Sequence, residues 1–241
     1  MSDTRFVKQN TMPKILLIIP AYNEAESIER VVKNIEENFP QYDYVVVNDG
    51  SKDSTADICR KNKYNLIDLP INLGLSGAVQ AGMRYAVKNK YDAALRYDGD
   101  GQHRAEYIAE LVSMMVERDW DIVIGSRFVN EKKQHTLRML GSHFISFIIK
   151  VSTGQTIKDP TSGMRLFSKK VLHEFAYDMN YGPEPDTISY LIKNGVKVKE
   201  VQVHMDERIA GESYLNIVRS MRYMVLMSFS ILFMQAFRKR R

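Results

Sequence analysis

Cysteine and long hydrophobic runs are both scarce in this chain of 241 residues. Its single cysteine, Cys59, cannot form an internal disulfide, and a structural zinc site built on cysteine is not expected. A reducing, cytoplasmic compartment fits this composition. The longest apolar-rich stretch, residues 223–237, contains two serines and a glutamine. It is shorter than the about 20 residues that a membrane-spanning helix needs.

Neither basic nor acidic residues are in marked excess over most of the chain. The net charge is +5, and the last four residues, 238–241, are all basic. The remainder is therefore nearly neutral, which argues against a nucleic-acid-binding protein. Residues 1–13 lack the apolar core of a secretory signal and are expected to form a flexible leader. We expect one globular domain over residues 14–212, followed by a C-terminal helix and basic tail over residues 213–241.

Apolar runs of strand length alternate with amphipathic helical segments in the first half of the chain. The expected strands are residues 14–20, 44–48, 64–69, 93–98 and 121–125. The expected helices are residues 27–38, 54–62, 76–89 and 105–118. This alternation predicts an α/β fold with a mostly parallel sheet flanked by helices. The second half is less regular. Helices are expected at residues 137–152, at 186–194 and from about 213, and short strands at 166–168 and 196–203.

Two carboxylates separated by a glycine, Asp98 and Asp100, follow the fourth expected strand. Ligands of parallel sheets bind at the carboxyl ends of strands. Mg²⁺ and Mn²⁺ prefer oxygen ligands and often share them with substrate phosphates, so this turn is a candidate metal site. An ordinary Asp-Gly turn is the alternative. His103, at the end of the same turn, is expected to be exposed to solvent, with a phosphate contact as the other possibility.

Two further polar segments, residues 20–24 and 48–51, follow the first and second expected strands. Tyr22 offers a flat face on which a base could stack. Asp49 could accept hydrogen bonds from a base or a ribose. Taken singly, each segment is better explained as a turn, because Asn-Asp-Gly-Ser is a favourable turn sequence.

Several motifs occur in a fixed order along the chain. They are PAYNE (20–24), NDGS (48–51), NLGLSGAVQAG (72–82), DGDGQH (98–103), GSRF (125–128), DPTSGMR (159–165) and ERIAGES (207–213). From about residue 14 to residue 213, the chain resembles the family-2 glycosyltransferases of the GT-A fold. The later motifs resemble the polyprenyl-phosphate branch, which includes dolichol-phosphate mannosyltransferase. The resemblance implies an inverting enzyme that uses Mg²⁺ or Mn²⁺. It would transfer a sugar from a UDP-sugar to a polyprenyl phosphate for cell-envelope polysaccharide synthesis.

The resemblance also implies roles for individual residues. Those that would hold the nucleotide sugar are Pro20, Ala21, Tyr22, Glu24, Asp49, Gly50, Ser51, Gly77, Asp98 and Arg127. The metal ligands would be Asp98, Asp100 and Gln102. The phosphates of donor and acceptor would be bound by Arg127, Arg165, Arg208 and Ser213. Residues with a catalytic role would be Asp100, Arg165, Glu184 and Asp186. Arginine suits phosphate because its guanidinium donates two parallel hydrogen bonds.

Some features leave alternatives open. Tyr214 stands where the branch usually has a lysine, and the chain lacks the added transmembrane helices of its integral members. Glu184 and Asp186 could position the sugar, contact the metal or act as a base, or they could cap the helix that begins near them. A base would be needed if the acceptor were a sugar hydroxyl on a growing polysaccharide. A non-catalytic scaffold that binds nucleotide sugars is the alternative of another class.

The C-terminal segment has an apolar residue at each third or fourth position. These residues are Tyr214, Val218, Met221, Val225, Phe229, Leu232 and Ala236. The spacing predicts an amphipathic helix, and the basic tail follows it. Such a helix can lie in the interface of an anionic bilayer. We therefore expect peripheral association with the cytoplasmic face of the membrane, through the helix alone, a small membrane partner or a homo-oligomer. Packing on its own domain is the alternative.

Overall fold

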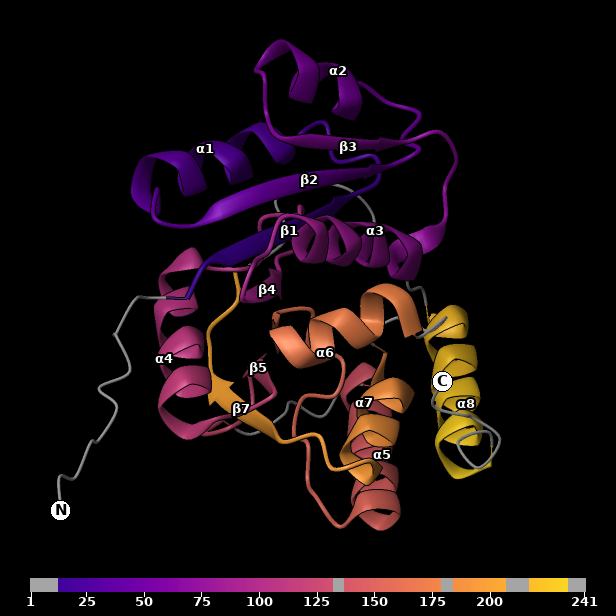
Figure 1. Cartoon of the computed structure of the whole chain (residues 1–241). Coiled ribbons are helices and arrows are strands. Elements are labelled where there is room, and N and C mark those ends of the chain that lie inside the picture. Colours follow the sequence, from indigo (N-terminus) through magenta and orange to yellow (C-terminus); the bar gives the residue numbers. More distant parts are fainter. Residues whose placement is uncertain (1–12, 132–136, 179–183, 207–216, 234–241) are drawn as a thin grey trace, which may run out of the picture.

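A seven-stranded sheet forms the centre of the computed structural model, which describes residues 13–131, 137–178, 184–206 and 217–233 (Figure 1). Its strands are β1 (Ile15–Ala21), β2 (Asp43–Asp49), β3 (Leu66–Leu69), β4 (Ala93–Arg96), β5 (Ile122–Ser126), β6 (Arg165–Ser168) and β7 (Val198–Gln202). The strand order is β3-β2-β1-β4-β6-β5-β7. Only β6 is antiparallel to its neighbours, so the mostly parallel sheet predicted from the sequence is confirmed.

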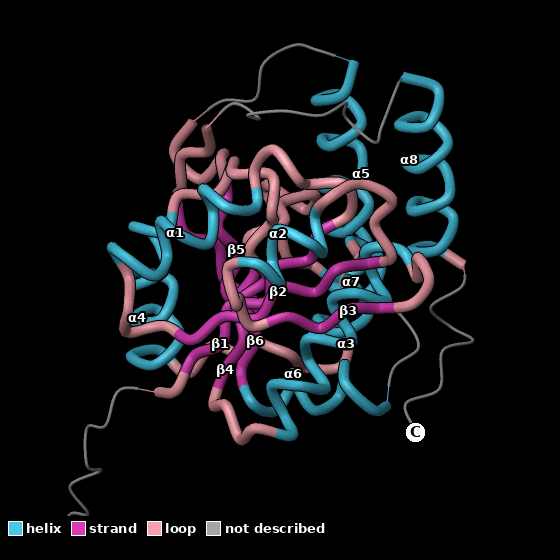
Figure 2. Tube along the Cα trace, turned by 90° about the horizontal axis from the view of Figure 1, so that it is seen from above, coloured by secondary structure: helices cyan, strands magenta, loops and turns pink. Residues whose placement is uncertain are grey.

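Helices cover both faces of the sheet (Figure 2). They are α1 (Ile28–Asn38), α2 (Thr55–Lys61), α3 (Gly74–Lys88), α4 (Ile108–Arg118), α5 (Leu137–Thr153), α6 (Lys169–His173), α7 (Pro185–Lys193) and α8 (Ile217–Leu232). A 3-10 turn at Ala105–Tyr107 precedes α4, and a π-helical turn at Glu174–Asp178 continues α6. The sequence did not predict α6 or its π-helical continuation.

Two hydrophobic cores lie on opposite faces of the sheet. Alternate residues of β1 enter each core: Leu16 and Ile18 pack with α3, whereas Leu17 and Ile19 pack with α1. All four are fully buried. This alternation follows from the two-residue period of a strand. Because helices cover both faces of the sheet, the polar residues that follow the carboxyl ends of the strands are the ones available to form a site.

The helix α8 packs against α5 and α7. At Gly141 of α5, a Cβ atom would overlap the Sδ atom of Met224, so the absence of a side chain there lets the two helices approach closely. Packing on its own domain is thus confirmed for one side of α8. Within the described residues, no helix combines the length and apolar character needed to cross a membrane. The expected helix start near Ser213 and residues 1–12 of the expected leader, which was predicted over residues 1–13, lie outside the described residues.

Candidate functional site

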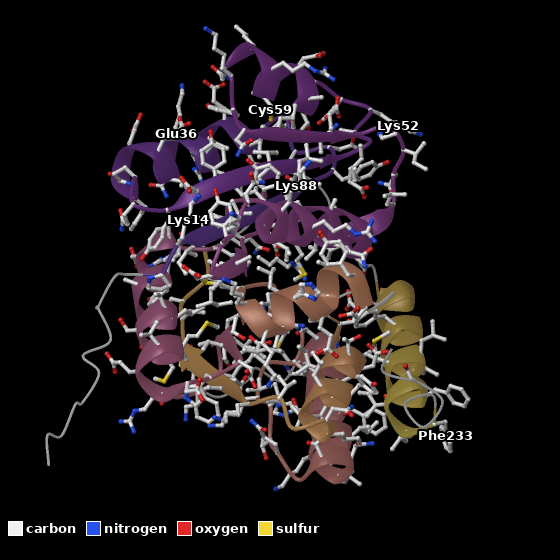
Figure 3. The ribbon with its side chains drawn as sticks, viewed as in Figure 1. Lys14, Glu36, Lys52, Cys59, Lys88 and Phe233 are labelled. Atoms are coloured by element: carbon white, nitrogen blue, oxygen red, sulfur yellow. The ribbon has the colours of Figure 1, made fainter. Side chains whose placement is uncertain are left out.

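The carboxyl ends of β1 and β2 are joined by hydrogen bonds between the segments that follow them. The backbone N–H of Asn23 donates to Ser51 Oγ at 3.0 Å, and the N–H of Lys52 donates to Asn23 Oδ1 at 2.9 Å. In the view of Figure 3, Lys14, just before β1, lies left of centre, and Lys52, just after β2, lies at the upper right. The predicted nucleoside-binding segments therefore form one connected edge of the sheet.

A second connection joins this edge to the turn after β4. The hydroxyl of Ser27 donates to the carbonyl of Gly99 at 2.8 Å, and the N–H of Glu24 donates to Thr55 Oγ1 at 2.9 Å. Gly99 lies against β1, since a Cβ there would be 3.1 Å from the carbonyl oxygen of Pro20. The structure thus brings the predicted nucleoside and metal segments together, although they are far apart in the sequence.

Asp49 is almost fully buried at the end of β2. Its Oδ1 accepts the N–H of Leu73 at 2.7 Å and so anchors the segment that leads into α3. Gly50 has a φ of 64°, and a Cβ there would be 2.7 Å from the nitrogen of Asn72. Gly77 also lies close to Leu73. The role of Asp49 toward a nucleoside stays a prediction, and the structure adds an anchoring role.

The turn after β4 presents the oxygen ligands predicted for a divalent cation. Asp100 is mostly buried, and its Oδ1 accepts the N–H of Gln102 at 3.1 Å. The Nε2 of Gln102 donates to the carbonyl of Asp206 at 3.3 Å, so the ligand atom that this side chain could offer is its carboxamide oxygen. Hard oxygen donors of this kind fit Mg²⁺ or Mn²⁺. No cluster of three or more His, Cys, Asp or Glu suited to a metal occurs in the described residues.

Asp98 is held by an arginine that the sequence analysis did not single out. Arg96 donates from Nε to Asp98 Oδ1 at 2.9 Å and from Nη2 to Oδ2 at 3.2 Å. Burial raises the pKa of Asp98, but the charge and hydrogen bonds of Arg96 outweigh this and hold that pKa below its usual value. The signal was present in the sequence, because residues two apart in a strand lie on the same face.

The prediction of an exposed His103 is wrong. The side chain is buried, and its Nδ1 accepts the backbone N–H of Asp98 at 3.0 Å. The hydroxyl of Tyr97 donates to the carbonyl of His103 at 2.5 Å. Burial lowers the pKa of His103 below its usual value despite the nearby carboxylates. His103 therefore shapes the turn as a neutral hydrogen-bond acceptor.

The two described arginines with a predicted phosphate role are both engaged within the protein. Arg127 donates to the two carboxylate oxygens of Asp159 at 2.7 and 2.9 Å, and Asp159 is fully buried. Arg165 donates to the carbonyls of Ser162 and Pro160 at 2.8 and 2.6 Å. Their contact with phosphate stays a prediction. What the structure adds is that both arginines hold the segment 159–165, which contacts Asp98 of the turn after β4 through Gly163.

The acidic residues at the start of α7 bind α8. Glu184 Oε2 accepts the hydroxyl of Tyr223 at 2.5 Å, and Asp186 Oδ2 accepts the hydroxyl of Ser230 at 2.6 Å. Asp186 Oδ1 also accepts the N–H of Thr187 in the first turn of α7 at 2.8 Å, as expected of a capping acid. No pattern in the sequence indicated Tyr223 or Ser230 as their partners. Two further predicted phosphate ligands, Arg208 and Ser213, lie outside the described residues, as does Tyr214.

Comparison with known families gives the class of protein. Residues 16–175 match the family described as Glycosyl transferase family 2. The chain belongs to this family. Because this is a family of glycosyltransferases, the chain is an enzyme, and the alternative of a non-catalytic scaffold is set aside.

Characterised relatives act on lipid phosphates, as their names state. The UDP-N-acetylglucosamine–dolichyl-phosphate N-acetylglucosaminyltransferase of Methanococcus voltae is 32% identical over 213 residues, which is 78% of this chain and 84% of the relative. The undecaprenyl-phosphate mannosyltransferase of Micrococcus luteus is 30% identical over 215 residues, which is 84% of this chain and 88% of the relative. The predicted resemblance to the polyprenyl-phosphate branch is confirmed.

A solved structure confirms the fold. The glucosyl-3-phosphoglycerate synthase of Mycobacterium tuberculosis, in complex with Mn²⁺ and UDP-glucose, matches with a TM-score of 0.65 and 14% identity. The match covers 91% of this chain and 79% of that chain. At this identity the likeness establishes the GT-A architecture of the glycosyltransferase.

Proposed function

We propose that this glycosyltransferase is an inverting, metal-dependent enzyme that transfers a sugar from a UDP-sugar to a polyprenyl phosphate for cell-envelope polysaccharide synthesis. One observation carries the proposal: the turn with the predicted metal ligands lies against Pro20 through Gly99, and the segment after Pro20 is hydrogen-bonded to the second predicted nucleoside segment through Asn23 and Ser51. The names of the relatives support the acceptor. The Mn²⁺ and UDP-glucose bound to the fold neighbour support the donor and the cation.

The chemistry of this transfer needs no general base. A phosphate acceptor is ionised near pH 7, so one of its oxygens forms the new bond to the anomeric carbon as the bond to the leaving diphosphate breaks. Inversion at that carbon follows from attack opposite the leaving group. This agrees with Glu184 and Asp186, whose carboxylates accept hydrogen bonds from α8. A bound cation, held by Asp100 and Gln102 with Asp98, would neutralise the charge of the leaving diphosphate.

The outer sides of α5 and α8 fit a peripheral membrane location on the cytoplasmic face. Large apolar side chains are 49–68% exposed there. They are Leu140, Phe144, Phe147 and Val151 on α5, Val225, Leu226, Phe229 and Leu232 on α8, and the following Phe233. We call this set the α5/α8 apolar surface. Figure 3 shows Phe233 projecting from the outer side of α8. Neither helix contains an acidic residue, and four basic residues end the chain. An anionic bilayer matches both features.

An assay of lipid labelling tests the proposed function. Full-length protein is incubated with undecaprenyl phosphate in vesicles, Mn²⁺ or Mg²⁺, and a panel of radiolabelled nucleotide sugars, and the lipid is then extracted. We expect label in the lipid with a UDP-sugar, and none with excess EDTA. Undecaprenol, which lacks the phosphate, is the matched control and should stay unlabelled. Label in undecaprenol or in polysaccharide instead of the lipid phosphate would contradict the proposal.

A further inference from the structure

Arg96 occupies the predicted metal site with a fixed positive charge. It ends β4 two residues before Asp98 and is 9% exposed. Its guanidinium uses two donors, one on each carboxylate oxygen of Asp98. Such a paired geometry is the strong form of an arginine–carboxylate interaction. Asp98 therefore already has a cationic partner before any metal ion arrives.

The surroundings prevent this ion pair from rearranging easily. A Cβ at Gly163 would overlap Asp98 Oδ2 and would lie 3.1 Å from Arg96 Nη2, so the segment 159–165 is pressed against the pair. On the other side, His103 fixes the backbone of Asp98. Arg165 pairs in register with Arg96 across β4 and β6 and holds the segment that contains Gly163. The carboxylate of Asp98 is thus held between these groups.

Asp100, the other carboxylate of the turn, accepts the backbone N–H of Gln102 at its Oδ1. Of the two carboxylates, Asp98 is the one whose two oxygens both accept hydrogen bonds from Arg96. A divalent cation at Asp98 would also face the charge of Arg96, which costs free energy in a partly buried site.

We propose that Arg96 is a positioning residue that shares Asp98 with the metal ion, so that the free protein binds the ion weakly. The ion then binds well only together with a nucleotide diphosphate, whose phosphates add oxygen ligands and negative charge. This inference rests on the proposed use of a divalent cation. Its consequence is specific to this chain: loss of Arg96 strengthens the binding of the ion to the free protein, whereas loss of an ordinary structural residue would weaken it.

The test measures Mn²⁺ binding to full-length protein by the electron paramagnetic resonance signal of the free ion, without donor or acceptor. Arg96→Gln should tighten Mn²⁺ binding at least about tenfold, because Asp98 is released and the opposing charge is removed. The matched control is Arg104→Gln, since Arg104 is paired with the exposed Asp206 in the same region. This control should change the affinity less than about twofold.

The same substitution made in a variant that lacks the Asp98 carboxylate tests whether Arg96 acts by sharing that carboxylate or only by its charge. In Asp98→Asn protein, the additional Arg96→Gln change should tighten Mn²⁺ binding less than about threefold, because the shared carboxylate is absent. Equal tightening in both backgrounds, or no tightening in either, would overturn the inference. Circular dichroism checks folding. If Arg96→Gln does not fold, Arg96→Lys replaces it, since it keeps the charge but loses the paired donors, and it should still tighten binding measurably.

The outcome is independent of the proposed function in one respect. If Mn²⁺ binds neither the free protein nor the protein with UDP, the metal dependence in the proposed function fails. If Mn²⁺ binds in the presence of UDP but Arg96→Gln leaves the affinity of the free protein unchanged, only the inference about Arg96 fails.

Discussion

Two regions of the molecule differ in whether their side chains find partners within the protein. At the carboxyl edge of the sheet, the polar groups of the site bind one another, as Asp98 does with Arg96 and Asp49 with the N–H of Leu73. On the outer sides of α5 and α8, large apolar groups such as Phe147 and Phe229 are 60% and 54% exposed. The edge is organised by the chain itself, whereas the α5/α8 apolar surface becomes buried only against another phase or another molecule.

A comparison of helices makes the same point. The helix α1 buries Ile28 and Ile35 and turns an i, i+4 ion pair of Glu29 and Lys33 toward water. Among the residues of α5 and α8 whose side chains the structure describes, the exposed positions are largely apolar. Each of these helices packs one apolar side on the rest of the molecule, α1 on the sheet and α8 on α5 and α7. Their outer sides distinguish the solvated part of the molecule from the part that we assign to the membrane.

The largest effect is expected at the edge. Asp100→Ala removes one of the two carboxylates predicted to hold the cation, so transfer should fall at least about 1,000-fold while the fold persists. Initial rates with vesicle-bound undecaprenyl phosphate measure this, and thermal unfolding checks the fold. Asp57→Ala, which removes a highly exposed acid on α2, is the control and should keep the wild-type rate. A wild-type rate for Asp100→Ala would remove the metal role from the turn.

The second-largest effect is expected for changes in the α5/α8 apolar surface, and it should concern membrane binding alone. Replacing Phe144, Phe147 and Phe229 together by serine should weaken binding to anionic vesicles about 100-fold, because each ring loses part of its favourable transfer from water. Binding of UDP, measured by calorimetry, should not change. Val116→Ser on α4 is the control, since Val116 is 56% exposed away from this surface.

Salt separates the two contributions to that binding. Attraction of the basic tail to anionic lipid should weaken at high salt, whereas the apolar contribution should remain. If the triple variant instead changes the oligomeric state and leaves vesicle binding intact, the surface is an interface between copies of the chain and the membrane assignment is wrong.

A smaller effect is expected at Asp49. Asp49→Ala should raise the KM for the donor about tenfold with little change in kcat, because the proposed contact to the nucleoside exists in both ground and transition states. Asp49→Asn is the informative partner, since its carboxamide oxygen can still accept the N–H of Leu73. A similar rise in KM for both variants supports nucleoside binding, whereas a normal KM for Asp49→Asn would leave only the anchoring role.

The smallest effect concerns the attachment of α8. Tyr223→Phe removes the hydroxyl that donates to Glu184, so the free energy of unfolding should fall by about 1 kcal/mol in urea titrations. Tyr177→Phe, at an exposed tyrosine, should leave it unchanged. A large loss of kcat in Tyr223→Phe without loss of stability would instead give Glu184 a role in the reaction.

The sequence predicted the fold where its pattern is local. Alternating apolar runs located β1 and β2, and the turn residues after them located the site. It did not predict that β6 is antiparallel, because four residues such as Arg165–Ser168 contain no information on strand direction. Direction is set by which strands the segment meets in the folded sheet.

The sequence was less informative about partners distant along the chain. His103 follows a polar turn, which in a sequence indicates exposure. Its burial depends on a tertiary contact, the hydrogen bond from the backbone N–H of Asp98 to its ring. Glu184 and Asp186 have an acidic character that fits either a base or a cap, and their partners Tyr223 and Ser230 lie 39 and 44 residues away in sequence. Tertiary packing decides such cases, and a periodic pattern does not encode it.

Nuclear magnetic resonance of the purified lipid product tests the central proposal most directly. The enzyme is supplied with a UDP-sugar of α configuration and undecaprenyl phosphate, and the anomeric proton is examined for its coupling to phosphorus and to the neighbouring ring proton. The account predicts a sugar bonded through its anomeric carbon to a single phosphate, with the β configuration. A product of α configuration, or one joined to a sugar hydroxyl without coupling to phosphorus, would contradict it.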